Sequence, residues 1–386
     1  MSSFHSLIGL VGLACLAVAA AYAVITLVAL ALWQLRPASG VADRLPPVTL
    51  LKPLCGAEPG LYEHLRGFCR QDYPDYQIVF GVRDAADPAL LVVDRLIREY
   101  PTLPIDVVVD PRLHGNNLKV SNLINMLAKA RHELLVMADS DAFVGSDYLG
   151  IVSAPLLDPG VGLVTCSYRG VPTEGIWSRL GAMYINEWYV PSMLVAWLFG
   201  YEGYVSGQTM CVRQDTLRAI GGLTAIADHL ADDHRLGELV SALGLRIILS
   251  PYMVEGEHHE QNYASLARHE MRWMRTIRVL RPISFSMIFL SFSFPLALLG
   301  LLMCYVGTPH PLAAWSLFAV SAVVRLVFHF VPRFQGKRPL LPDLWLVPIR
   351  DLLLCWIWFR SFFTTRVTWR GSEFDVDADG FMRRLT

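Results

Sequence analysis

The feature that most constrains this chain is an apolar segment at its start. No Lys, Arg, Asp or Glu occurs from Phe4 to Trp33, a run longer than the ~20 residues that a helix needs to cross a bilayer. A cleavable signal peptide is the alternative, but it has a basic start and an apolar core of only ~7–15 residues. Here the first Lys or Arg is Arg36. We therefore predict a transmembrane anchor, and Arg36 and Arg44 after it predict a cytoplasmic location for the next domain.

A second apolar block follows Arg281. Ile283–Val306 lacks charged residues and is long enough to span the membrane, and Pro311–Val331 is a further candidate. The single charge of that segment, Arg325, is expected to extend toward the lipid headgroups. Leu340–Phe363 contains several charges, which are costly at bilayer depth, so we predict a re-entrant or interfacial segment there.

The composition agrees with a membrane protein and excludes other classes. The chain is 54% hydrophobic and 17% charged, below the ~25% charged residues of ordinary soluble domains, which also excludes a disordered protein. Lys and Arg number 33 against 34 Asp and Glu, so no basic field predicts a nucleic-acid partner. The seven cysteines form no CxxC pair, and neither a disulfide framework nor a zinc site is predicted.

The middle of the chain alternates between strand-like and helix-like segments. The predicted strands are Pro47–Leu51, Tyr76–Arg83, Ile105–Val109, Glu133–Ala138 and Arg246–Val254. The predicted helices are Leu61–Gln71, Ala89–Tyr100 and Lys119–Ala130. Such alternation predicts an α/β fold with a parallel, helix-covered sheet. Ligands bind beyond the carboxyl ends of the strands in these sheets, so polar residues that follow apolar strands are the first candidates for a site.

Carboxylates occupy such positions. Asp84 follows the second predicted strand, and Asp139-Ser140-Asp141 follows the fourth. Two carboxylates two residues apart can face one Mg²⁺ or Mn²⁺ and leave coordination positions for phosphate oxygens, which suits a nucleoside diphosphate. A solvated turn is the alternative for the D-x-D, and a self-bonded turn for Asp84.

Two further acidic or histidine-rich segments are candidates. Asp232-Asp233 lies in a dense acidic segment, for which an exposed helix N-terminus is the alternative. His258 and His259 follow the last predicted strand. They are candidate metal contacts, but a surface turn is the favoured interpretation.

The segment after the α/β region predicts a basic helix. Cations recur every three or four residues from Arg268 to Arg281, which predicts one basic stripe of an amphipathic helix lying on anionic headgroups. Arg272-Trp273 is the notable pair, because a guanidinium can bind a diphosphate and an indole can pack against a sugar or an apolar acceptor tail.

The predicted organisation therefore has five parts. They are a transmembrane anchor, a cytoplasmic α/β domain, an interfacial helix with the Arg-Trp pair, a transmembrane and re-entrant block and a cytoplasmic tail, over residues 1–36, 45–260, 261–282, 283–365 and 366–386. The later basic residues favour cytoplasmic flanks, namely Arg333, Lys337, Arg338, Arg366, Arg370, Arg383 and Arg384.

Taken together, these segments resemble the membrane-bound inverting glycosyltransferases of the GT-A fold. Within them the chain is similar to the ceramide glucosyltransferase family and its bacterial relatives, the hopanoid-biosynthesis glycosyltransferases that add N-acetylglucosamine to bacteriohopanetetrol. The stretches that carry the resemblance are 50–54, 82–84, 87–89, 119–123, 138–140, 206–210, 221–223, 231–233 and 272–273. The resemblance implies a GT-A-type, Rossmann-like mixed sheet.

The resemblance also implies roles for individual carboxylates. Asp84 corresponds to the family aspartate that contacts the uridine, and Asp139 to the one at the metal and diphosphate. Asp141 completes the D-x-D as a second metal ligand, and Asp233 corresponds to the catalytic base. The matching stretches also contain two candidate substrate-binding residues, Lys119 and Asp232.

The basic helix carries the remaining motif of the family. Arg272 and Trp273 correspond to the last two positions of the family's (Q/R)xxRW motif and are implied to be catalytic. His269 stands at its first position, a departure from the family pattern, and is a candidate for substrate binding. Arg350-Asp351 is a further candidate, for shaping the entry of the acceptor.

The resulting prediction is an inverting glycosyltransferase of the bacterial inner membrane. It would move a sugar, N-acetylglucosamine, from a UDP-sugar to a hydroxyl of a membrane lipid, a hopanoid polyol, with the help of Mg²⁺ or Mn²⁺. One alternative is glucosylation of ceramide from UDP-glucose. Another is a non-catalytic, nucleotide-binding membrane scaffold. A processive polysaccharide synthase is disfavoured, because it needs more membrane spans to form a polymer channel.

Overall fold

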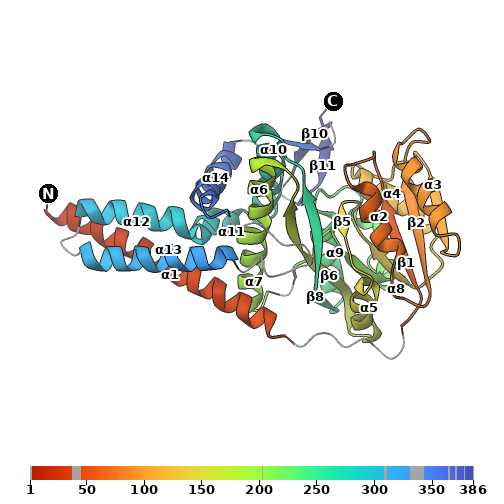
Figure 1. Cartoon of the computed structure of the whole chain (residues 1–386), viewed down its shortest axis with the longest axis horizontal. Coiled ribbons are helices and arrows are strands. Elements are labelled where there is room, and N and C mark those ends of the chain that lie inside the picture. Colours follow the sequence, from red (N-terminus) through yellow and green to blue (C-terminus); the bar gives the residue numbers. More distant parts are fainter. Residues whose placement is uncertain are drawn as a thin grey trace. The chain divides into compact units, whose positions relative to one another are not determined.

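The computed structural model describes residues 2–36, 45–201, 203–307, 311–330, 343–363, 366–369, 372–377 and 379–385 (Figure 1). The basic residues Arg44, Arg333, Lys337, Arg338 and Arg370 lie outside these ranges. The chain divides into two compact units, each described by itself. The helical unit contains Met1–Arg36, Arg169–Gly200 and His258–Gly371, and the sheet unit contains Pro37–Tyr168, Tyr201–Glu257 and Ser372–Thr386.

An eight-stranded sheet forms the sheet unit, in the order β3-β2-β1-β4-β7-β6-β8-β5. Its strands are β1 (Val48–Pro53), β2 (Tyr76–Val82), β3 (Ile105–Val109), β4 (Leu134–Met137), β5 (Ala142–Phe143), β6 (Val161–Pro172), β7 (Met210–Arg213) and β8 (Arg246–His258). The first four strands run parallel, whereas β7 is antiparallel to β4 and β6. The predicted mixed α/β sheet is confirmed, and the five predicted strands all form.

Helices cover both faces of the sheet, which explains why the central strands are apolar throughout. Successive residues of a strand point to opposite faces, so Leu50 and Leu51 of β1 belong to two different cores. One core contains α2 (Leu61–Cys69) and α3 (Ala89–Glu99). The other contains α4 (Leu118–Leu127) and α9 (Asp232–Ala242). Shorter helices α5 (Tyr148–Ser153) and α8 (Gln214–Ala219) and the hairpin β10 (Ser372–Val376) and β11 (Met382–Arg384) complete this unit.

The helical unit consists mainly of helices, which differ in length and polarity. They are α1 (Ser2–Gln34), α6 (Gly175–Tyr184), the π-helical turn η2 (Ile185–Tyr189), α7 (Val190–Leu198), α10 (Tyr263–Leu280), α11 (Pro282–Met287), α12 (Ser293–Gly307), α13 (Pro311–Phe330) and α14 (Leu346–Arg360). By length and composition, Phe4–Gln34 and Leu312–Phe330 can each cross a membrane. Gly12 and Gly300 let α1 and α12 approach so closely that a Cβ on either would lie 2.7 Å from the other's carbonyl oxygen.

One apolar segment is bent, and one membrane prediction differs from the structure. Ile283–Val306 does not form one straight helix, because the chain bends by 69° between Pro282–Ser291 and Ser293–Gly307. Arg325 does not extend toward headgroups. It is buried, and it forms ion pairs with Asp351 and Glu187, at 2.8 Å each. That 340–363 is re-entrant or interfacial stays a prediction, and the described part of this segment includes the 15-residue helix α14.

The loop before α4 makes a close backbone contact that can be tested. Asn117 N–H donates to the carbonyl of Ala227 at 2.8 Å, and a Cβ on Gly115 would lie 2.7 Å from the carbonyl carbon of Ala227. Backbone cannot move aside as a flexible side chain can, so we expect Gly115→Ala to destabilise the protein by about 1–3 kcal/mol. The measurement is thermal unfolding of the detergent-solubilised full chain. The matched control is Gly150→Ala in α5, where an added Cβ meets no atom within 4 Å. Equal midpoints for the two variants would contradict the prediction.

Candidate active site

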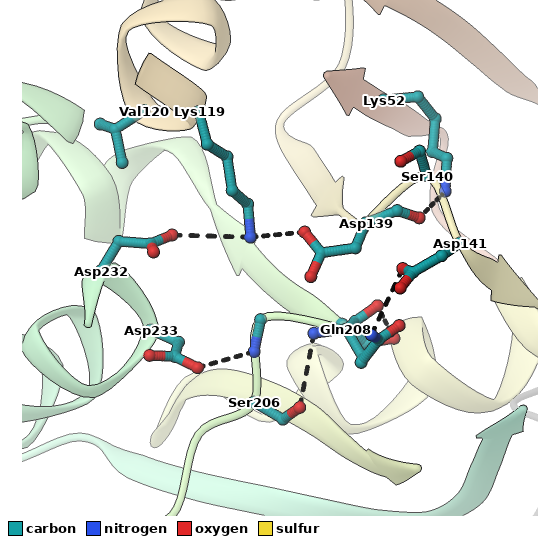
Figure 2. A network of polar contacts seen from close by, with 12 residues as sticks. Lys52, Lys119, Val120, Asp139, Ser140, Asp141, Ser206, Gln208, Asp232 and Asp233 are labelled. Carbon is teal, nitrogen blue, oxygen red and sulfur yellow. Dashed lines mark hydrogen bonds and ion pairs between the residues drawn. The ribbon is translucent and has the colours of Figure 1, made fainter. Parts of the chain in front are cut away.

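Four charged side chains predicted from the sequence converge in the sheet unit (Figure 2). The Lys119 Nζ lies 2.6 Å from Asp139 Oδ1 and 3.7 Å from Asp232 Oδ2. Asp139 follows β4, Lys119 lies in the first turn of α4, and Asp232 and Asp233 form the first turn of α9. We call Lys119, Asp139, Asp232 and Asp233 the carboxylate–lysine cluster. It lies at the carboxyl end of β4, where α/β sheets bind ligands.

Asn117 fixes two parts of this cluster at once. Its side-chain oxygen accepts a hydrogen bond from Val120 N–H, which caps α4 and sets the direction of Lys119. Its side-chain nitrogen donates to the carbonyl of His229 at 2.9 Å and contacts Asp232 at 3.4 Å. The start of α4 is therefore joined to the start of α9 by one buried amide.

Gly207 lies between three of the charged groups. Its N–H donates to Asp233 Oδ2 at 2.9 Å. A Cβ at this position would lie 3.1 Å from Lys119 Nζ, 3.5 Å from Asp139 Oδ2 and 3.6 Å from Asp233 Oδ2. A side chain at this position would crowd the Lys119 ammonium group, and the backbone of Gly207 provides a hydrogen-bond donor to the cluster.

Lys52 supports Asp139 through its backbone. The ammonium group of Lys52 donates to the carbonyl of Asp139 and lies 3.6 Å from the ring centre of Phe68. Burial lowers the pKa of Lys52 to about 7, although Asp139 and Asp141 raise it. Lys52 lies near the carboxyl end of the first strand, where polar residues are candidates for a site. The sequence alone nevertheless predicts no role for it.

The two carboxylates of the D-x-D have chemistry that suits a hard divalent cation. Asp141 Oδ1 has a long contact, 3.4 Å, with Gln208 Nε2, and Asp139 is paired with Lys119. Within the described ranges, no three His, Cys, Asp or Glu side chains gather closely enough to hold a metal by themselves. A cation here would therefore need phosphate oxygens or water to complete its coordination.

The electrostatics of the cluster change the proton affinity of Asp233. Burial, together with the negative charge of Asp232, raises the pKa of Asp233 to about 6. Lys119 and the N–H groups of His234 and Gly207 act in the opposite direction. The pKa of Lys119 is raised by Asp139 and Asp232, which together outweigh its burial. Asp232 is only 8% exposed, so the exposed-terminus interpretation of this helix start is wrong.

None of the described contacts joins the Asp84 side chain to the carboxylate–lysine cluster. Asp84 follows β2 and is exposed, and its carboxylate accepts a hydrogen bond from Ala86 N–H at 2.9 Å within its own turn. Because β2 and β4 both run parallel to β1, Asp84 and Asp139 follow strands that end at the same edge of the sheet. Asp87 accepts hydrogen bonds from Gly56 N–H and Ala89 N–H, which orders the loop after β1.

The motif residues of α10 form a second group, which belongs to the helical unit. Trp273 stacks on Tyr184 with ring centres 5.2 Å apart, and the ring of His269 lies 4.1 Å from that of Trp273. His269 Nδ1 lies 2.9 Å from Glu260 Oε1, and the guanidinium carbon of Arg272 lies 5.9 Å from the Trp273 ring. His269, although not the Gln or Arg of the family motif, thus positions the indole between two rings.

His258 differs from its predicted setting. It is buried at the end of β8 and lies 3.5 Å from Glu260 Oε2, so a surface turn is wrong for this residue. His259 is half-buried. The pairing of His258 with Glu260 could not be predicted from the sequence, because the two residues lie in a run of acidic and histidine residues in which no pair stands out.

The C-terminal hairpin makes a contact that sequence reasoning missed altogether. Met382 N–H donates to the carbonyl of Asp228 at 2.8 Å, and Leu230 N–H donates to the carbonyl of Gly380 at 3.0 Å. The ring of Phe381 lies 4.2 Å from that of His229. The chain end therefore braces the loop that leads into Asp232 and Asp233.

Comparison with known proteins identifies the family of the chain. The model of the family described as glycosyl transferase family 21 matches residues 11–382, nearly the whole chain. The chain belongs to glycosyl transferase family 21. It is therefore a glycosyltransferase, and the resemblance to the ceramide glucosyltransferase family is confirmed.

Individual relatives are distant. Ceramide glucosyltransferase 1 of Caenorhabditis elegans is 22% identical over 353 residues, which cover 88% of this chain and 73% of that protein. Ceramide glucosyltransferase 3 of the same organism is 23% identical over 232 residues, 60% of this chain and 50% of that protein. Among solved structures, the mannosyltransferase PcManGT from Pyrobaculum calidifontis, in complex with GDP-Man and Mn²⁺, has a TM-score of 0.56 at 20% identity. The match covers 90% of this chain and 99% of that one. This likeness confirms the GT-A fold.

The raised pKa of Asp233 predicts a pH dependence for this family 21 enzyme. A carboxylate can act as a base only when ionised, so kcat/KM should fall as the pH drops through about 6. Asp232→Asn removes a negative charge that raises the pKa of Asp233, so the acidic limb should move to lower pH. The control is Glu238→Gln, which removes an exposed carboxylate from the same helix. An acidic limb that stays in place in Asp232→Asn, or moves equally in the control, would contradict this assignment.

Proposed function

We propose that the protein transfers a sugar from a UDP-sugar to a hydroxyl group of a membrane lipid, with inversion at the anomeric carbon. The observation that carries the proposal is the carboxylate–lysine cluster at the carboxyl edge of the sheet, in a chain that also has two apolar helices of membrane-spanning length. In this proposal residues 45–260 are the cytoplasmic catalytic domain, and the protein belongs to a bacterial inner membrane.

Asp233 is the proposed general base. Two backbone N–H groups, those of Gly207 and His234, hold its two oxygens at 2.9 and 2.8 Å. A pKa of about 6 makes it a stronger base than an ordinary aspartate while leaving it mainly ionised at neutral pH. It would take the proton of the acceptor hydroxyl as that oxygen attacks the anomeric carbon and the bond to UDP breaks.

The departing UDP requires charge stabilisation. Lys119 is the cation already present beside Asp139, and Asp139 and Asp141 would hold a Mg²⁺ or Mn²⁺ ion. Such an ion, when bound, supplies positive charge to the diphosphate oxygens. Asp84 is proposed to contact the uridine. Asp232 sets the charge around Lys119 and Asp233.

A role in binding the substrates is proposed for the motif of α10 from the family resemblance. Arg272 would contact the diphosphate, because a guanidinium matches phosphate geometry. Trp273 would pack against the sugar or the acceptor, and His269 would hold the indole in place. The stacking of Trp273 on Tyr184 and its contact with the ring of His269 support a fixed orientation for the indole.

Two lipid acceptors are in competition. A hopanoid polyol such as bacteriohopanetetrol, with N-acetylglucosamine as the sugar, is our first choice on the sequence resemblance. Ceramide, with glucose, is favoured by the names of the relatives. Both have an apolar body and a hydroxyl, which fits an enzyme with membrane helices. A nucleotide-binding scaffold is the alternative without catalysis.

The acceptor assay tests the function directly. Membranes containing the protein are given labelled UDP-N-acetylglucosamine or UDP-glucose, together with bacteriohopanetetrol or ceramide. We expect labelling of the hopanoid, and a loss of about 10²–10⁴-fold in turnover for Asp233→Asn, since its amide cannot accept the proton. Labelling of ceramide alone would overturn the hopanoid choice. Transfer that persists in a folded Asp233→Asn protein would refute the base assignment, and absence of all transfer would favour the scaffold.

Metal removal tests the proposed role of the D-x-D. Excess EDTA should abolish transfer, and Mg²⁺ or Mn²⁺ should restore it, because the diphosphate would otherwise face Asp139 and Asp141 without a cation. Asp141→Asn should raise the metal concentration needed for half-maximal rate by about tenfold or more. The control is Asp147→Asn, which lies on the same segment beyond β5. Full turnover in excess chelator would disprove metal dependence.

A further inference from the structure

A cavity lies inside the helical unit, among five segments that are far apart in the sequence. Its lining includes Tyr22 of α1, Glu187 and Ser192 of the continuous segment η2–α7, Ser293 of α12, Arg325 of α13 and Asp351 of α14. Its unfilled space, including the part open to solvent, is about 470 Å³.

Charged side chains line this cavity although they are deeply buried. Arg325 is 6% exposed, Glu187 7% and Asp351 8%. Arg325 donates to both oxygens of Asp351 at 2.9 and 2.8 Å, and its third nitrogen lies 2.8 Å from Glu187 Oε2. Ionisable groups within spanning helices are costly and are a default indication of a functional site.

Hydroxyl groups make up much of the remaining polar surface. Tyr22 and Ser192 share a hydrogen bond of 3.1 Å across α1 and α7, and Trp188 donates to Ser291 Oγ at 2.9 Å. Ser293 and Thr26 also line the cavity. Its walls therefore offer both donors and acceptors, as an uncharged ligand with several hydroxyl or amide groups requires.

Two irregularities of the helices occur at this cavity. The π-helical turn η2 contributes Glu187 and Trp188, and the 69° bend of the Pro282–Gly307 segment falls at Phe292, between Ser291 and Ser293. π-helical turns are frequent at functional sites. Broken helices at membrane depth are tolerated where they are buried in protein or line a cavity. Both observations point to a binding site rather than to a packing defect.

We propose that this cavity binds a hydroxyl- or amide-bearing part of the lipid acceptor other than the hydroxyl that receives the sugar, an inference that rests on the proposed function. An anionic ligand such as a nucleoside diphosphate is disfavoured, because Arg325 already faces two carboxylates. An uncharged polyol or a hydroxyl-and-amide group can donate to those carboxylates and to the hydroxyl oxygens, while the rest of the lipid contacts apolar residues such as Phe292 and Leu354.

A matched pair of substitutions on α1 tests the site. Ala23 is 6% exposed and lines the cavity, whereas Ala21, two residues earlier, is exposed. In nanodiscs, Ala23→Leu should raise the KM for the lipid acceptor by about tenfold or more and leave the KM for the UDP-sugar within about twofold. Ala21→Leu should change neither. Equal effects of the two variants, or an unchanged acceptor KM, would mean a water-filled structural cavity and would overturn the proposal.

A second variant covers the case in which Ala23→Leu fails to fold. Ser293→Ala removes one hydroxyl without adding volume, and we expect a rise of about two- to tenfold in acceptor KM with unchanged thermal stability. No rise in KM in a folded Ser293→Ala protein would count against the site.

Direct labelling separates this proposal from the proposed function. A ceramide carrying a diazirine is photolysed with the full-length protein in nanodiscs, with unlabelled bacteriohopanetetrol as competitor, and the labelled peptides are mapped. We expect competed labelling of peptides containing Tyr22–Thr26 or Val324–Phe328, and its loss in Ala23→Leu but not in Ala21→Leu. If transfer fails but this labelling occurs, the proposed function is wrong and the lipid site stands. Labelling that is not competed, or is equal in both variants, refutes the site.

Discussion

The geometry of the candidate active site depends on the ammonium groups of Lys52 and Lys119, which lie among several carboxylates. Asp139, Asp232 and Asp233 would repel one another if they were brought together alone, and Lys119 is the cation that lies between them. Burial raises the pKa of Asp233, and the charge of Asp232, which Lys119 compensates only in part, raises it further. A fully neutralised cluster would be more stable but would leave Asp233 a weaker base. The geometry that positions Lys119, from the Asn117 cap of α4, is therefore also what tunes the proposed base.

Much of this fold could be predicted because the relevant signals are local. Apolar runs of about four to seven residues predict the parallel strands, and the rule that ligands bind beyond strand ends is sufficient to select Asp84, Asp139 and Asp141. The same rule applies to Lys52, but a single lysine before a proline carries no chemistry until its contact with the Asp139 carbonyl is seen. Asp233 is selected only through the family resemblance, since its neighbours in sequence are equally acidic.

Several of the remaining features depend on contacts between residues in different segments of the chain, some of them more than a hundred positions apart. Asn117 reaches His229, and Asn116 reaches the carbonyl of Met382. No pattern within a segment encodes such pairs. Arg325 shows the same limit in the helical unit. Its position near the end of an apolar run favours an extension toward headgroups, and only the folded chain brings Glu187 and Asp351 to it. The bend at Phe292 could not be predicted for a related reason. An apolar composition indicates how long a helical segment is, but not whether it is bent.

The cavity of the helical unit and the carboxylate–lysine cluster of the sheet unit both contain buried charges. These charges are compensated in different ways, and the difference bears on the ligands that each would bind. In the helical unit, bidentate pairing with Asp351 and a contact to Glu187 satisfy Arg325, which suits an uncharged ligand. In the sheet unit, the four carboxylates of Asp139, Asp141, Asp232 and Asp233 face two ammonium groups, those of Lys52 and Lys119. Under the proposed function, a diphosphate entering this group alone would meet an excess of negative charge. A divalent cation would remove that excess, so binding of the cation before or together with the UDP-sugar is the order that the electrostatics favour.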